Sequence, residues 1–296
     1  MGYSARYHAA SLVAVFLALA VGILIGAGLG DNLVSDTEQS LRDSLEGDIE
    51  QARGEADELA AELERERAFS ARTYPALVGD AFEGDRIGLL ALGELSPELA
   101  TDIEDALEPT EGDLVEVAVV RRPPDVAALS SELANRPAAA LKKDPAAELE
   151  ALGIGLGRQF ALGRGKLLDR IRDNLFSRSS GEAGRLDRVI LTRAPFGELD
   201  DPDLENAEAL ESGLTEGVVR SGVASVAVER SDAAESQVAF FASFGITTVD
   251  SVDLVSGEVA MVFALLGAEG NFGVKGSATS LLPELLFPSG SGAGSG

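Results

Sequence analysis

The sequence predicts an α/β protein built from an N-terminal transmembrane helix, a coiled-coil stalk and a three-layer α/β domain with a mostly parallel sheet. Three observations predict this order: an uncharged apolar stretch at residues 9–30, a charged heptad pattern within residues 31–74, and short apolar runs alternating with helical segments over residues 75–288. A short head, residues 1–8, and a flexible Gly/Ser tail, residues 289–296, complete the chain.

The apolar stretch is long enough to cross a bilayer. Between Arg6 and Asp31 no side chain is charged unless His8 is protonated, and the 22 residues from Ala9 to Gly30 would form a helix of roughly 33 Å. A cleaved signal peptide is the alternative, but its apolar stretch is usually about 7–15 residues and ends at an A-x-A site. We therefore expect a retained anchor.

The charges that flank this anchor predict its orientation. Arg6 and the amino terminus precede the anchor, whereas Asp31, Asp36 and Glu38 follow it. Because positive flanks stay on the cytoplasmic side, we expect a single-pass protein of the cell membrane. Its N-terminus would be cytoplasmic and nearly all of the chain extracytoplasmic.

Small residues recur at every fourth position of the anchor, starting at Ala10. Small residues on one face of a membrane helix allow two backbones to approach closely, as in GxxxG dimers. Small residues are also common in membrane helices in general, so the row favours a dimer without requiring one. The predicted membrane dimerisation face is Ala14, Ala18, Gly22, Gly26 and Gly30.

The stretch that follows predicts a second dimer contact. It is charged and helix-favouring, and we expect its helix to end at Pro75. Its apolar positions alternate in spacings of four and three, the heptad pattern of a parallel two-stranded stalk of roughly 60 Å. A single amphipathic helix lying on the α/β domain is the alternative. The predicted coiled-coil core is Leu45, Ile49, Ala52, Ala56, Leu59 and Leu63.

Beyond the stalk, nearly continuous apolar runs are typical of buried parallel strands. Helical segments, several of which begin at a proline or behind a serine cap, separate these runs. The expected strands are Arg86–Leu92, Leu114–Val120, Arg188–Ala194 and Val223–Glu229. The expected helices are Pro97–Leu107, Asp125–Ala134, Pro145–Phe176, Pro202–Arg220, Ala233–Phe244 and Gly257–Leu266.

Composition excludes several classes of function. With 50 acidic and 24 basic residues the net charge is −26, which opposes binding to nucleic acid and to anionic lipid. There are no cysteines, so disulfides and thiolate metal sites are excluded. The acidic surface either serves solubility or gathers divalent cations or basic partners.

No nucleotide-binding motif is present. The first expected strand leads into ALGELSPE, which lacks GxGxxG, and GIGLGRQFALGRGK follows no strand and lacks the GxxxxGK[ST] register. Arginines do recur at the carboxyl ends of the expected strands, the edge where open sheets bind ligands. They predict an anion-binding crevice, or else simply cap strand ends in solvated loops: Arg121, Arg122, Arg193 and Arg230.

Catalysis has little support in the sequence. The only histidine, His8, lies in the head, so no Ser-His-Asp triad or histidine metal site is expected in the outer domain. Paired carboxylates are too frequent in this acidic chain to single one out. We expect a protein that is not an enzyme, with no cofactor and no resident metal.

The run YHAASLVAVFLALAVGILIGAGLGD, the charged helix after it, and the late stretch GEVAMVFALLGAEGNFGVKGSATSLLP together resemble the actinobacterial copper transport protein B (MctB) family. The resemblance covers essentially the whole chain. It implies a membrane-anchored cell-envelope protein of copper efflux or homeostasis. Some relatives are associated instead with envelope assembly and division, so the alternative is a non-enzymatic dimeric adaptor or scaffold with an envelope or division partner.

Overall fold

The computed structural model describes residues 3–132 and 144–284, with side chains described at 7–26, 41–42, 44–132 and 144–284. The chain divides into two compact units, residues 1–69 and 70–296, which we describe separately. The Gly/Ser tail, residues 289–296, and part of the expected helix Asp125–Ala134 lie outside the described residues.

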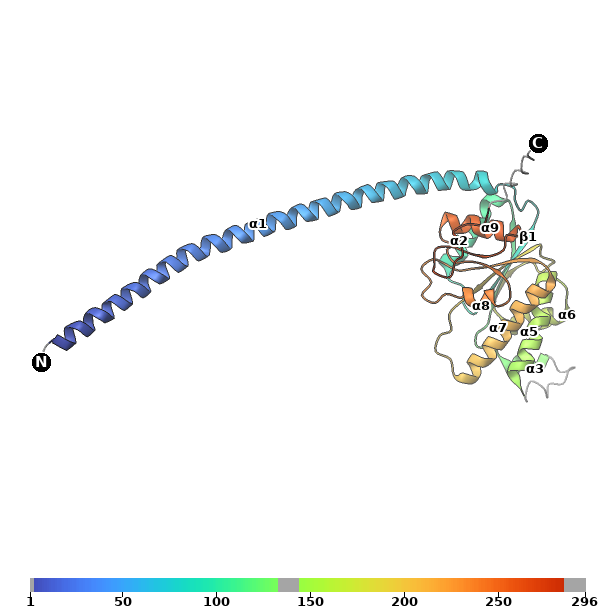
Figure 1. Cartoon of the computed structure of the whole chain (residues 1–296). Helices are drawn as coiled ribbons and strands as arrows, with labels where there is room; N and C mark the ends of the chain where they lie inside the picture. Colours follow the sequence, from blue (N-terminus) through green and yellow to red (C-terminus); the bar gives the residue numbers. More distant parts are fainter. Residues whose placement is uncertain (1–2, 133–143, 285–296) are drawn as a thin grey trace, which may run out of the picture. The chain divides into compact units, whose positions relative to one another are not determined.

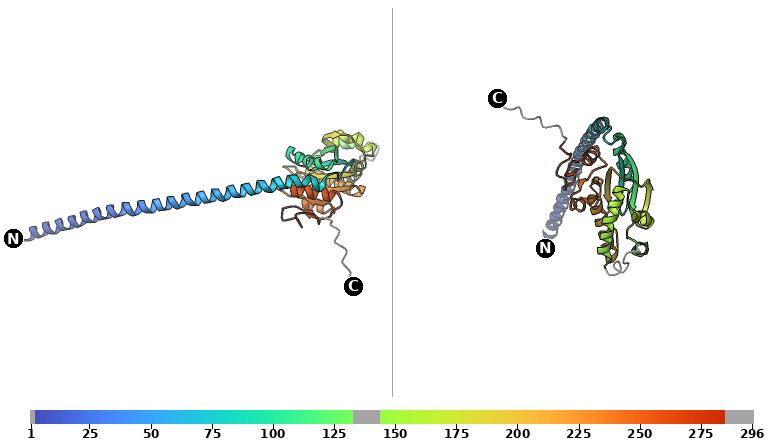
Figure 2. Two further views of the ribbon diagram at one scale, coloured as in Figure 1. Left: turned by 90° about the horizontal axis from the view of Figure 1, so that it is seen from above. Right: turned by 90° about the vertical axis from the view of Figure 1, so that its right-hand side faces the viewer.

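The first unit is formed by helix α1, which runs without interruption from Tyr3 to Val78 (Figure 2). The last turns of α1, from Ser70 onward, belong to the second unit. The stretch Tyr7–Gly26 of α1 has a mean hydropathy of 2.6 and is long enough to span a membrane. The expected anchor is thus confirmed as an apolar helix. The stalk sequence is helical too, while its pairing with a second copy stays a prediction.

The expected helix end at Pro75 is wrong by one turn. Proline removes one helical hydrogen bond, yet α1 continues to Val78, and the Pro75 carbonyl still accepts the N–H of Gly79 at 2.9 Å. Tyr74 and Val78 are buried in the core of the second unit. Packing of this last turn therefore outweighs the local cost of the proline.

Within the described residues, the second unit contains a seven-stranded sheet of order β3-β2-β1-β4-β5-β6-β7, in which only the β2–β3 pair is antiparallel. The four strands expected from sequence are confirmed with small shifts at their ends. They are β1 (Arg86–Leu92), β2 (Asp113–Val120), β4 (Arg188–Arg193) and β5 (Ala224–Val228).

Three further strands were not expected. β3 (Phe176–Gly181) is polar and exposed beyond its first residue, so it lacks the apolar pattern of a strand. β6 (Thr247–Val249) and β7 (Asn271–Phe272) are too short to produce one. These strands are held by hydrogen bonds to their neighbours in the sheet.

Helices cover both faces of the sheet (Figure 1). The end of α1 packs with α2 (Pro97–Leu107) and α9 (Val255–Leu265) in the core on one face. The opposite core contains α3 (Val126–Glu132), α5 (Pro145–Leu162), α6 (Lys166–Leu175), α7 (Asp201–Ser221) and α8 (Val238–Ala242).

Two expected helices differ from those observed. The expected Pro145–Phe176 is two helices, because Gly163 ends α5 in the left-handed conformation (φ 60°) and α6 begins three residues later. The expected Ala233–Phe244 shrinks to the five residues of α8, since the residues before it form a loop that contributes to the cavity described below.

Candidate functional site

The sheet topology creates a crevice at the carboxyl ends of β1 and β4. β1 continues into α2 on one face of the sheet, whereas β4 continues into α7 on the other. Adjacent parallel strands whose connections leave in opposite directions leave room between their loops, and open α/β sheets bind ligands there. The loops after β2 and β5 flank the same edge.

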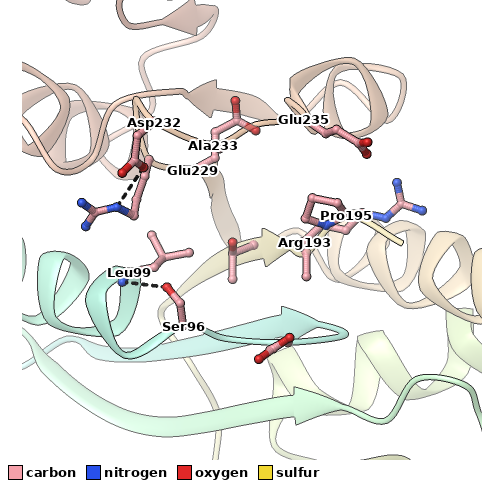
Figure 3. A pocket seen from close by; sticks show the side chains of 12 residues that line it. Ser96, Leu99, Arg193, Pro195, Glu229, Asp232, Ala233 and Glu235 are labelled. Carbon is pink, nitrogen blue, oxygen red and sulfur yellow. Dashed lines mark hydrogen bonds and ion pairs between the residues drawn. The ribbon is translucent and has the colours of Figure 1, made fainter. Parts of the chain in front are cut away.

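A cavity of about 240 Å³ opens at this edge (Figure 3). The loop after β1, the start of α2, the end of β4 and the loop between β5 and α8 contribute its walls. Its charged side chains are Glu94, Arg193, Glu229, Arg230, Asp232 and Glu235. It brings together two of the four arginines predicted for an anion crevice.

Behind the cavity, Glu211 of α7 binds two of the predicted arginines. Its Oε1 accepts the Nε–H of Arg122 at 2.8 Å, and its Oε2 accepts the Nε–H of Arg193 at 2.9 Å. Glu211 is only 1% exposed. A buried carboxylate of this kind is tolerated because each of its oxygens receives a charged donor.

Each of these two arginines makes further contacts. Arg122 also donates to the carbonyl oxygens of Ala194 and Pro195, both at 2.9 Å. Arg193 donates to Oε1 of Gln237 at 2.8 Å. Both guanidinium groups lie over the ring of Phe196, at 4.1 and 4.6 Å from its centroid. These contacts tie together the loops that follow β2 and β4.

A second charged network holds the loop after β5. Arg230 forms ion pairs with Asp102 of α2 and with Asp232, the latter at 3.1 Å. Glu229 accepts the Nζ of Lys275 at 2.8 Å and the backbone N–H of Gln237 at 2.6 Å. The cations that border the cavity therefore already have protein acceptors.

The fourth predicted crevice arginine lies elsewhere. Arg121 donates to the carbonyl oxygens of Asp173, Asn174 and Phe176 at 3.3–3.4 Å, at the end of α6 and the start of β3. A cation at a helix C-terminus interacts favourably with the helix dipole. Arg121 therefore binds the C-terminal end of α6 and does not line the cavity.

Burial alters proton affinities between α9 and α2. Burial, followed by the nearby carboxylates of Asp105 and Asp102, raises the pKa of Glu258 to about 7. Burial also raises the pKa of Asp102, although its pair with Arg230 opposes the rise. Tyr74 has a raised pKa, chiefly through burial and then through Glu258. The Tyr74 hydroxyl donates to the Ala106 carbonyl at 2.5 Å, which binds the last turns of α1 to α2.

The donor set does not fit a resident copper ion. Copper in proteins prefers thiolate, thioether and imidazole ligands, and this chain has no cysteine, one histidine and two methionines. Met261 lies on α9 and is 0% exposed within the apolar core. Among the described residues no group of three or more His, Asp and Glu side chains is placed to hold a metal.

The predicted dimerisation residues of α1 are open to solvent in this single chain. A Cβ atom added at Gly22 or Gly26 would meet nothing within 4 Å, and Ala14 and Ala18 are exposed. The side chain position of Gly30 lies outside the described residues. All six predicted coiled-coil residues, Leu45, Ile49, Ala52, Ala56, Leu59 and Leu63, are exposed.

Sequence reasoning missed Glu211, Gln237 and Lys275. Glu211 is one of several acids in α7, and only its place among the buried residues Ala207, Leu210 and Leu214 distinguishes it. A helical projection of α7 would have found that signal, because these positions share one face of the helix. Lys275 follows a glycine-rich loop, where no periodic pattern indicates a partner.

Comparison with known proteins gives one family assignment. No curated protein matches the chain. The model of the family described as copper transport outer membrane protein, MctB, matches residues 3–283, nearly the whole chain, which includes both the apolar helix and the α/β unit. The chain therefore belongs to the MctB family of copper transport proteins.

Proposed function

We propose that this chain serves copper efflux as a membrane-anchored, dimeric adaptor that acts through protein contacts and does not itself ligate copper. Family membership supports the link to copper. The observation that carries the adaptor role is the exposed heptad stripe on a helix continuous with the apolar span. In this proposal the head lies in the cytoplasm and the α/β unit outside it.

Charges beside the stripe favour a parallel pair. With Ile49, Ala56 and Leu63 at position a, a parallel in-register dimer sets each g residue against the next e residue of the second copy. Asp48 then meets Arg53 of the second copy, and Glu62 meets Arg67 of the second copy. An antiparallel pair would instead align g with g, and the g positions Asp48, Glu55 and Glu62 are all acidic.

A second function fits the same geometry. A non-enzymatic scaffold of envelope assembly or division would need the same anchor, stalk and outer unit, and none of these features is specific for copper. Deletion of the chain distinguishes the two functions. Loss of copper tolerance would indicate the copper-efflux adaptor, whereas loss of envelope integrity or of cell separation would indicate the scaffold.

Survival of copper stress tests the proposal. A strain that lacks the chain is expected to stop growing at a lower copper concentration than its parent. Expression of the full chain should restore copper tolerance. Met261→Leu should restore it as well, because the substitution removes the extracytoplasmic thioether with little change in volume. The double variant Leu59→Asp, Leu63→Asp should fail, since it places four like charges in the core of the stalk dimer.

Two results would oppose this account. Unchanged copper tolerance in the deletion strain would leave the scaffold as the remaining function. Loss of tolerance with Met261→Leu, at unchanged protein level, would mean that copper ligation by this chain matters.

A further inference from the structure

The arginines of the cavity at the β1–β4 edge are already neutralised by the protein. Arg193 is bound by Glu211 and Gln237, and Arg230 by Asp102 and Asp232. An incoming anion would have to displace a carboxylate from at least one of them. Glu211 is only 1% exposed and binds both Arg122 and Arg193, so an anion cannot readily displace it from Arg193. The cavity is therefore poorly suited to the anion that the arginines alone predicted.

The exposed carboxylates that line the cavity have fewer ion-pair partners than its arginines. Glu94, from the loop after β1, and Glu235, from the loop before α8, are exposed, and neither takes part in an ion pair within the described residues. Asp232 has one partner, Arg230, and is itself exposed. Figure 3 shows Asp232 and Glu235 on the same wall, across the cavity from Ser96 and Leu99. The uncompensated charge at the mouth is negative.

The floor supplies a polar group without a partner. Thr192, near the end of β4, lines the cavity and is 2% exposed. None of the hydrogen bonds found over the described ranges involves its hydroxyl. Its hydroxyl is not among the fully buried atoms of the described residues that lack a partner, so it remains available to a ligand in the cavity.

Size and walls limit what can enter. Pockets for drug-sized ligands usually measure about 300–1,000 Å³, and this one is smaller, at about 240 Å³. Leu99, Ala194, Pro195 and Ala233 provide apolar surface between the carboxylates and the floor. A long side chain with an apolar stem and a cationic head matches this combination.

We propose that the cavity receives an arginine or lysine side chain of a protein partner, whose cationic head pairs with Glu94 and Glu235. The inference rests on the proposed function, because it names the group that the adaptor would bind. The strongly acidic surface, with a net charge of −26, would favour approach of a basic partner.

Calorimetric titration of the full chain in detergent micelles tests this assignment. The probes are the neutral-ended peptide acetyl-Ala-Arg-Ala-amide, the free guanidine agmatine, and inorganic phosphate. We expect saturable binding of the peptide that weakens with added salt. The double variant Glu94→Gln, Glu235→Gln should weaken peptide binding about tenfold.

The matched control is Glu208→Gln, an exposed carboxylate of α7 that does not line the cavity, which should leave peptide binding unchanged. Near-ultraviolet circular dichroism checks that each variant is folded. Binding of phosphate in place of the peptide, binding of agmatine without the peptide, equal loss in the control, or no saturable binding would each overturn the proposal. None of these results involves copper, so a failure here is distinguishable from a failure of the survival test.

Discussion

Replacement of Glu211 by Gln is expected to lower the free energy of unfolding of the α/β unit by about 3–5 kcal/mol. The substitution keeps the shape of the side chain but removes the charge that binds Arg122 and Arg193. Both guanidinium groups have side chains only 9% exposed, so water cannot replace the lost carboxylate fully.

Urea unfolding of the full chain in detergent, followed by near-ultraviolet circular dichroism, measures this loss. Tyr74 is buried in the α/β unit and reports on its tertiary packing. Glu208→Gln makes the same chemical change on the exposed side of α7 and should alter stability by less than about 0.5 kcal/mol. A loss below about 1 kcal/mol for Glu211→Gln would mean that solvent reaches the two arginines.

Substitution of Gly157 by Ala is expected to destabilise the same unit by about 3 kcal/mol or more. A Cβ atom at this position of α5 would lie 2.1 Å from the carbonyl oxygen of Leu214 in α7. Backbone cannot move aside as a flexible side chain can, so the two helices would have to separate along their contact.

Gly155 provides a control within the same helix. A Cβ atom there would meet nothing within 4 Å, so Gly155→Ala should stabilise the unit by about 0.5–1 kcal/mol through helix propensity. The same urea titration compares the two variants. Equal effects from Gly155→Ala and Gly157→Ala would contradict the close contact between α5 and α7.

The glycines of α5 show what sequence reasoning can and cannot assign. The run GIGLGRQ fails as a phosphate loop, and two of its three glycines, Gly153 and Gly157, instead pack against α7. Gly153 and Gly157 face Gly213 and Gly217, so each helix carries a GxxxG pattern at the crossing. From sequence the GxxxG pattern was interpreted only in the membrane helix, where dimerisation stays a prediction. The pair in the α/β unit became evident when the fold placed α5 beside α7.

Strong periodic patterns allowed the central strands and most helices to be predicted. The apolar runs at Arg86–Leu92 and Arg188–Arg193 and the capped start of α2 at Ser96 have local causes that the sequence displays. The polar edge strand β3 and the short β6 depend on hydrogen bonds to neighbouring strands, which a local pattern does not contain.

The candidate site could be predicted only in part. Its position at the carboxyl edge follows from the parallel sheet, and Arg193 and Arg230 do line the cavity. Their pairing with Glu211 and Asp102 could not be seen, because those acids lie 18 and 128 residues away in the sequence. Those pairings are the reason why we propose a cationic ligand in place of an anion.

Disulfide crosslinking in membranes tests the parallel dimeric stalk most directly. The chain has no cysteine, so a single introduced cysteine can crosslink only with the same position in a second copy. Leu59 lies at a core position of the predicted heptad, and Ala61 lies on the outer face of the same helix. Oxidation of Leu59→Cys in membranes should give a covalent dimer in high yield, whereas Ala61→Cys should remain monomeric. Monomer from both variants, or equal crosslinking of both, would contradict a parallel in-register stalk.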